Sequence, residues 1–151
     1  MIRISEVICK EGIILDLAAG EKVAVIKELV AKLTELKLIE DSETFLRDIL
    51  KRENLESTGI GLGVAIPHAR TKAASELILT YGYSKKGVDF NSLDGKKSHF
   101  IFLIAAPEDQ KTRYIMALAR LSKTLRKEEA RTRLVKAASE DEVVDILKEV
   151  E

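Results

Sequence analysis

Cysteine, histidine, proline and tryptophan are scarce in this sequence of 151 residues, which has one cysteine, two histidines, two prolines and no tryptophan. The lone cysteine, Cys9, excludes an intramolecular disulfide, which is consistent with a reducing compartment. One cysteine and two histidines also cannot form a Cys/His zinc set, and no spacing supports a mixed site of histidine and carboxylates. We therefore expect no metal site.

A net charge and long apolar runs are absent as well. The 25 basic side chains balance the 25 acidic ones, so no overall field favours nucleic acid or an anionic membrane. The longest apolar run, Phe100 to Ala106, is far too short to cross a bilayer. The first residues contain no apolar signal-peptide segment. We therefore expect a cytoplasmic protein with no nucleic-acid partner and no direct membrane insertion.

The hydrophobic pattern predicts an α/β fold in one domain that covers residues 1–151. Apolar residues recurring every three or four positions predict helices over residues 21–37, 41–53, 111–125, 127–138 and from 139 onward. Short apolar runs predict strands over residues 12–17, 62–66, 77–83 and 99–106, the last buried on both faces. Residues 69–76 are predicted to be a loop and residues 85–96 to be rich in turns. Because strands and helices alternate without strict βαβ order, we expect a three-layer sandwich in which a mixed β-sheet has helices on both faces.

One stretch, Ser57 to Arg70, concentrates the features that indicate chemistry. Three of the eight glycines fall within five residues here, and the apolar run that follows stops at Pro67, directly before His68. Proline fixes its own φ and has no N–H, so it ends a strand well. The pattern predicts a histidine at the mouth of a strand, within reach of a large partner and able to change charge near neutral pH. A structural histidine beside an ordinary turn is the alternative.

Other candidate sites have simpler explanations. The glycines from Gly59 to Gly63 lack dinucleotide-binding spacing and precede a strand-like run, so no nucleotide cofactor is expected. Gly95 to Ser98 is expected to be a surface turn. His99 is interpreted as a strand-edge residue without chemistry, and Cys9 has no activating neighbour in the sequence.

Three segments together resemble a known active-site signature. They are Arg52 to Leu55, Ser57 to Gly61 and Val64 to Ala69, and they resemble the signature of the fructose/mannitol-type enzyme IIA of the bacterial phosphotransferase system. The segments Gly87 to Gly95 and Ile104 to Glu108 are also similar to this family. The resemblance covers essentially the whole chain and implies an α/β sandwich around a mixed sheet.

The resemblance implies that the protein is a phosphotransferase without a cofactor. His68 would accept a phosphoryl group from the histidine phosphocarrier protein and pass it to a IIB component that serves a membrane permease. The attacking atom would be Nε2, and a hydrogen bond to the other ring nitrogen would fix the tautomer.

The same resemblance assigns supporting roles. Arg52 aligns with the arginine of the motif and would bind phosphoryl oxygens, although a cation at a helix C-terminus also favours the dipole. Ser57 and Thr58 would cap the turn, donate hydrogen bonds to phosphate, or do both. Gly59 belongs to the loop whose N–H groups would bind the phosphoryl oxygens. Many members carry a second histidine where an ungapped alignment places Tyr114, a phenol that stays neutral near pH 7.

The sequence leaves the biological role open. A fructose-type transport component is the main hypothesis. The alternative is the nitrogen-related type, which controls other proteins by its phosphorylation state. An interaction module that has lost its chemistry would require a His68 that cannot be phosphorylated.

Overall fold

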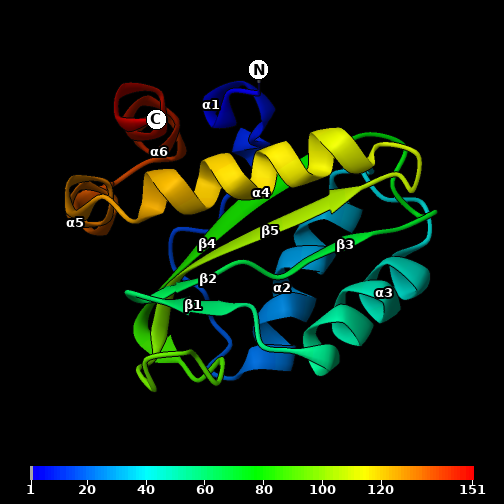
Figure 1. The fold of residues 1–151 in the computed structure, drawn as a ribbon, viewed down its shortest axis with the longest axis horizontal. Helices are drawn as coiled ribbons and strands as arrows, with labels where there is room; N and C mark the ends of the chain where they lie inside the picture. The colour runs from blue at the N-terminus through cyan, green and yellow to red at the C-terminus, as the bar shows by residue number, and fades with distance from the viewer. Residues whose placement is uncertain (1) are drawn as a thin grey trace.

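The computed structural model describes residues 2–151 and shows a β-sheet between two layers of helices (Figure 1). The helices are α1 (Ile4–Val7), the 3₁₀ turn η1 (Lys10–Gly12), α2 (Lys22–Glu35), α3 (Ser42–Leu55), α4 (Lys111–Leu125), α5 (Glu128–Lys136) and α6 (Glu140–Val150). The strands are β1 (Gly59–Gly61), β2 (Val64–Ala65), β3 (His68–Arg70), β4 (Ile78–Val88) and β5 (Ser98–Ala106). The predicted α/β sandwich with a mixed sheet is confirmed.

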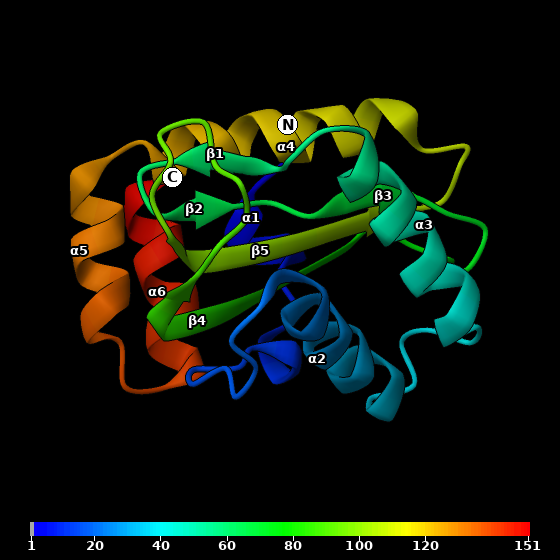
Figure 2. The same ribbon diagram turned by 90° about the horizontal axis from the view of Figure 1, so that it is seen from below.

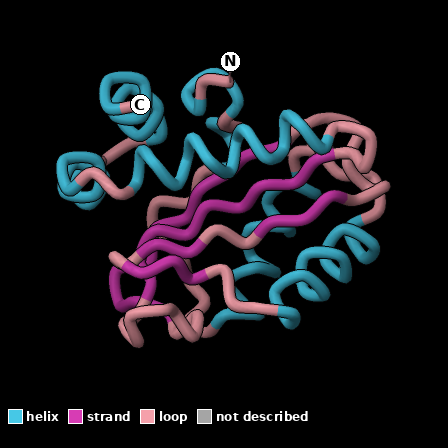
Figure 3. The backbone as a smooth tube through the Cα atoms, viewed as in Figure 1, coloured by secondary structure: helices cyan, strands magenta, loops and turns pink. Residues whose placement is uncertain are grey.

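The central strand of the sheet is β5. On one side β4 runs antiparallel to it, and on the other side β2 and β3 both run parallel to it, one after the other. β1 adds an antiparallel strand outside β2. Figure 3 shows this order, with the connection between β2 and β3 drawn as a loop along the same edge.

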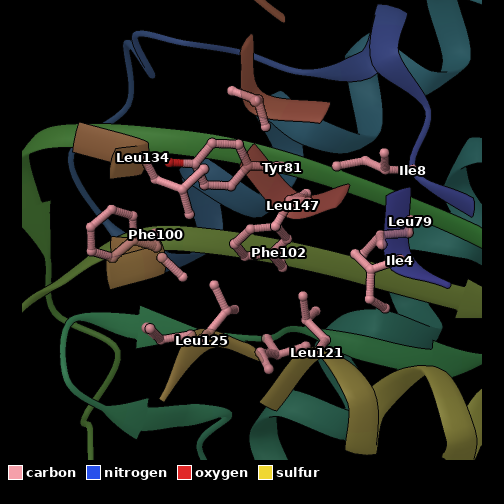
Figure 4. Close-up of a cluster of buried hydrophobic side chains, with 14 of the residues drawn as sticks. Ile4, Ile8, Leu79, Tyr81, Phe100, Phe102, Leu121, Leu125, Leu134 and Leu147 are labelled. Carbon is pink, nitrogen blue, oxygen red and sulfur yellow. The ribbon is translucent and has the colours of Figure 1, made fainter. Parts of the chain in front are cut away.

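Two hydrophobic cores lie on the two faces of the sheet, as predicted for β5. Alternate residues of β5 serve each face: Phe100, Phe102 and Ile104 pack toward α1, α4, α5 and α6, whereas Ile101 and Leu103 pack toward α2 and α3. Figure 4 shows the first of these cores, and Figure 2 shows α2 and α3 on the opposite face. All five of these side chains are buried.

The apolar run over residues 62–66 is not one strand, which corrects the prediction. Gly61, Leu62 and Gly63 all have positive φ, at 88°, 59° and 77°, and form the turn between β1 and β2. Glycine reaches this conformation without cost, whereas Leu62 does so with some strain.

Pro67 interrupts the sheet edge instead of ending it. Its carbonyl accepts the N–H of Ile104, but proline has no N–H of its own to donate. The chain re-enters the sheet at once, so His68 is the first residue of β3. The predicted loop over residues 69–76 is therefore wrong for its first two residues.

Three other expectations need correction. Residues 12–17 form no strand: Ile14 makes a single bridge to Gly82, and Leu17 donates to the Tyr83 carbonyl. β4 extends through residues expected to form turns, with an irregular register between Tyr83 and Val88. The short helix α1 was not predicted, because a helix of four residues is too short to show periodicity.

The caps of two predicted helices agree with the sequence. Asp41 accepts the N–H of Thr44 at the start of α3, and Ser139 accepts the N–H of Glu142 at the start of α6. Within residues 2–151, no helix has the combination of length and hydrophobicity that a membrane span requires.

Candidate active site

His68 lies at the outer edge of the sheet, in register with Ile104 of β5. Neighbouring residues in register point to the same face, so the imidazole projects toward the side covered by α4. The ring is half-buried, and its centroid lies 5.8 Å from that of Tyr114, near the start of α4, with the ring planes tilted by 51°. The structure therefore brings together two residues that are 46 positions apart in the sequence.

A backbone hydrogen bond fixes the tautomer of His68. Nδ1 lies 2.6 Å from the carbonyl oxygen of Ile66. Because a carbonyl oxygen only accepts, Nδ1 carries the proton and Nε2 carries the lone pair. This arrangement provides a nucleophilic nitrogen.

The surroundings of His68 keep the ring uncharged near neutral pH. Burial is the largest effect and lowers the pKa of His68, and the charge of Arg52 lowers it further. The bond to Ile66 and the charge of Glu53 act in the opposite direction but do not cancel the shift. A neutral imidazole is the form that can attack phosphorus.

A cleft of about 520 Å³ opens beside β3, and its lining includes Arg52, Arg70 and Tyr114. Arg52 belongs to the last turn of α3, where its Nη1 donates to the carbonyl of Glu56 at 2.8 Å. That bond uses one of the five N–H groups of the guanidinium. Arg52 therefore makes the contact expected of a cation at a helix C-terminus, and it also lines the cleft.

Tyr114 is neutral at physiological pH. Burial raises its pKa to about 12, although the charges of Arg52 and Arg70 act to lower it. The phenol can therefore act only as a neutral donor or acceptor of hydrogen bonds near pH 7.

The hydroxyls of Ser57 and Thr58 have protein partners. Ser57 Oγ donates to the carbonyl of Phe90 and accepts the N–H of Gly59. Thr58 is buried, and its Oγ1 donates to Glu53. The turn-forming role expected for both residues is present, and a phosphate-binding role would require their hydroxyls to exchange partners.

Gly59 is needed for close packing. A Cβ at this position would lie 3.0 Å from the Cα of Ser92 and 3.1 Å from the Cβ of Phe90. Its N–H is already donated to Ser57. Gly59 therefore lets the 57–59 segment lie against the loop that contains Phe90 and Ser92.

Glu53 is the residue that sequence reasoning missed. Its side chain is 2% exposed, and it forms an ion pair with Lys22 of α2, with Nζ 3.1 Å from Oε2. A signal was available, because Glu53 falls four residues after Ile49 and eight after Phe45, on the buried stripe of α3. A carboxylate on an apolar helix face needs a partner, and here it has three donors.

The other histidine of the chain, His99, is held by the backbone. Nδ1 of His99 donates to the carbonyl of Ser84 at 2.8 Å, and the ring lies against Gly87. Within residues 2–151 there is no group of three or more His, Cys, Asp or Glu side chains placed to hold a metal ion.

Comparison with known proteins identifies the class to which this site belongs. Residues 6–150 match the family described as "Phosphoenolpyruvate-dependent sugar phosphotransferase system, EIIA 2". The chain is 42% identical over 145 residues to the fructose-specific EIIABC component of Bacillus subtilis, covering 96% of this chain and 23% of that protein. It is 32% identical over 147 residues to the fructose-specific EIIA component of Haloferax volcanii, covering 97% and 96% of the two chains.

Solved structures agree with this class. The nitrogen regulatory protein IIA-Ntr of Neisseria meningitidis superimposes with a TM-score of 0.88 at 29% identity, covering 95% of this chain and 98% of that one. The IIA mannitol protein of Escherichia coli gives 0.78 at 25% identity, covering 92% and 97%. The chain therefore belongs to the EIIA type-2 family of the phosphotransferase system, whose general role is to carry a phosphoryl group.

Proposed function

We propose that His68 is the phosphoryl acceptor of this protein, taking the group from the histidine phosphocarrier protein and passing it to a IIB component. The observation that carries the proposal is the 2.6 Å bond between Nδ1 and the Ile66 carbonyl, because it leaves the lone pair on Nε2. A neighbour with a TM-score of 0.78, the IIA mannitol protein of Escherichia coli, was solved in complex with phosphorylated IIB mannitol. That complex supports a IIB partner for this chain.

In the proposed step, the lone pair of Nε2 forms a bond to phosphorus in line with the departing nitrogen. The N–P bond of the donor breaks, and its electron pair returns to the donor's ring. The proton on Nδ1 of His68 stays there, so the His68 ring gains positive charge as the new bond forms. The Ile66 carbonyl stabilises that charge, and Arg52 binds the phosphoryl oxygens.

A fructose-type transport role is favoured by the relatives. The proteins of 42% and 32% identity are both described as fructose-specific. A regulatory role is the second candidate, because the nitrogen regulatory protein of Bradyrhizobium diazoefficiens is 31% identical over 131 residues and IIA-Ntr superimposes well.

The test combines the protein with the general phosphotransferase enzymes, the phosphocarrier protein and labelled phosphoenolpyruvate. We expect a label that is lost in acid and kept in base, as for a phosphoramidate. His68→Ala should remain unlabelled, whereas the matched control His99→Ala should be labelled. A fully labelled His68→Ala variant contradicts the assignment. Onward transfer to a fructose-type IIB component supports transport, and labelling without onward transfer supports regulation.

A further inference from the structure

Glu53 is connected to His68 by an unbroken series of hydrogen bonds. Its carboxylate accepts the N–H of Thr58 at 2.9 Å and the Thr58 hydroxyl. The Thr58 carbonyl accepts the N–H of Ile66 at 3.0 Å. The Ile66 carbonyl in turn accepts Nδ1–H of His68 at 2.6 Å. A buried carboxylate at the end of α3 therefore holds the backbone that orients the acceptor ring.

The carboxylate is also held by the neighbouring helix α2, on the same face of the sheet. Lys22, at the start of α2, donates to Glu53 Oε2 at 3.1 Å, and its ammonium lies 5.5 Å from the centre of the Phe90 ring. The Phe90 carbonyl receives the hydroxyl of Ser57. Ser57 and Thr58 are therefore both fixed by these contacts. Thr58 bonds to Glu53, and Ser57 bonds to the carbonyl of Phe90, whose ring lies beside Lys22.

We propose that Glu53 is a positioning residue for phosphoryl transfer, acting through Thr58 and Ile66 on the orientation and charge of His68. The inference rests on the proposed role of His68. It accounts for a buried carboxylate in a site that must bind an anion: the carboxylate oxygens are occupied by their bonds to Thr58 and Lys22. Its negative charge raises the pKa of His68 and so favours the positive form of the ring.

The charged groups around the acceptor give the inference a measurable sign. Arg52 and Glu53 of α3 act on His68 in opposite directions, lowering and raising its pKa, and Tyr114 of α4 is neutral. Removing the Glu53 charge therefore leaves Arg52 unopposed. A residue that only stabilised the fold would not move the pKa of His68 in this direction.

The first experiment is an NMR titration of His68 in Glu53→Gln, with His99 as the internal reference. We expect a lower pKa for His68 than in the wild type. Glu43→Gln, an exposed change of the same charge on the same helix, should leave His68 unchanged. If Glu53→Gln does not fold, Lys22→Met gives the opposite prediction, because removing the cation beside Glu53 should raise the pKa of His68. A His68 titration that does not respond to either change overturns the inference.

The second experiment is a double-mutant cycle in single-turnover transfer from the phosphorylated carrier protein. Glu53→Gln should be about 10-fold slower or more, as for the loss of a charge-assisted hydrogen bond. Thr58→Val should be roughly 2- to 13-fold slower. If Thr58 acts through Glu53, the double variant should be no slower than Glu53→Gln alone. Losses that multiply would mean that the Thr58 hydroxyl acts on the phosphoryl group directly, which also contradicts the inference.

The two proposals fail in different ways. A wild-type protein that is not phosphorylated on His68 contradicts the proposed function, and the NMR titration still decides the effect of Glu53 because it needs no transfer. A wild-type protein that is phosphorylated normally, with a folded Glu53→Gln variant of equal rate and equal His68 pKa, contradicts only the positioning role.

Discussion

Tyr114 offers a direct test of what a second ring contributes beside the proposed acceptor, His68. Tyr114→Phe keeps the ring contact with His68, at 5.8 Å between centroids, and removes only the hydroxyl. A neutral hydrogen bond contributes about 0.5–1.5 kcal/mol, so transfer should slow by roughly 2- to 13-fold if the hydroxyl assists it. Stability should hardly change, because the aromatic pair is retained.

Tyr114→His places a second imidazole beside His68. The charges of Arg52 and Arg70, which act to lower the pKa of the phenol, would also lower that of an imidazole in the same place. The introduced ring should therefore be mostly neutral at pH 7 and become protonated only below its ordinary pKa of about 6.5. The variant should transfer well and show an additional dependence on pH in the acid range.

The assay is single-turnover phosphorylation of the three proteins by one preparation of carrier protein, from about pH 5.5 to 8.5, around the ordinary pKa of histidine. All three proteins receive the phosphoryl group from the same carrier protein, so the carrier's own titration cancels when their rates are compared as ratios. The wild type should show no step from Tyr114 in this range, because its pKa is about 12. A folded Tyr114→Phe variant that cannot be phosphorylated would refute the reasoning, since the phenol would then be essential.

Two further predictions concern the charge of Arg52 and the pKa of His68. Arg52→Ala should slow transfer roughly 10- to 150-fold if one charge-assisted bond is made only in the transition state. Arg52→Lys should recover part of the loss, because the charge is kept. A wild-type rate for Arg52→Ala would show that Arg52 has only a structural role, through its bond to the Glu56 carbonyl. The pKa of His68 is lower in the folded protein than in the unfolded chain, where it is about 6.5. The unfolded state therefore binds more protons as pH falls through this window, and the free energy of unfolding should decrease. In urea titrations His68→Gln should lose less stability than the wild type between neutral and acid pH; equal losses would show that His68 is not held neutral.

The sequence predicted the layers of this fold because its regular elements are long enough to show periodicity. Helices α2, α3 and α4 each present buried residues at helical spacing, and strand β5 is an almost continuous buried apolar run. Short elements gave no such signal. Helix α1 depends on Glu151, whose carboxylate accepts the N–H groups of Ile4 and Ser5 from the other end of the chain, and local sequence cannot predict that contact.

The candidate site was predicted in outline from residue types, spacing and the family resemblance, but its hydrogen bonds were not. The position of His68 after Pro67 and the family signature made His68 the candidate acceptor, and a bond to one ring nitrogen was expected, yet Ile66 as its partner became evident only from the structure. The turn at Leu62 was missed because leucine rarely adopts positive φ. Glu53 was missed because its immediate neighbours in sequence are polar, while its ion-pair partner Lys22 lies on another helix, 31 residues away.

The site consists of a local part and a distant part, and this division predicts how a change at Tyr114 would act. Residues from Glu53 to His68 are linked by hydrogen bonds within one continuous segment that folds back on itself as β1, β2 and β3. That segment alone fixes Nδ1 of His68. Tyr114 reaches the ring from α4 after the chain has passed through β4 and β5, and it touches the ring without holding its nitrogen. A change at Tyr114 should therefore alter the rate of transfer while leaving the tautomer of His68 intact.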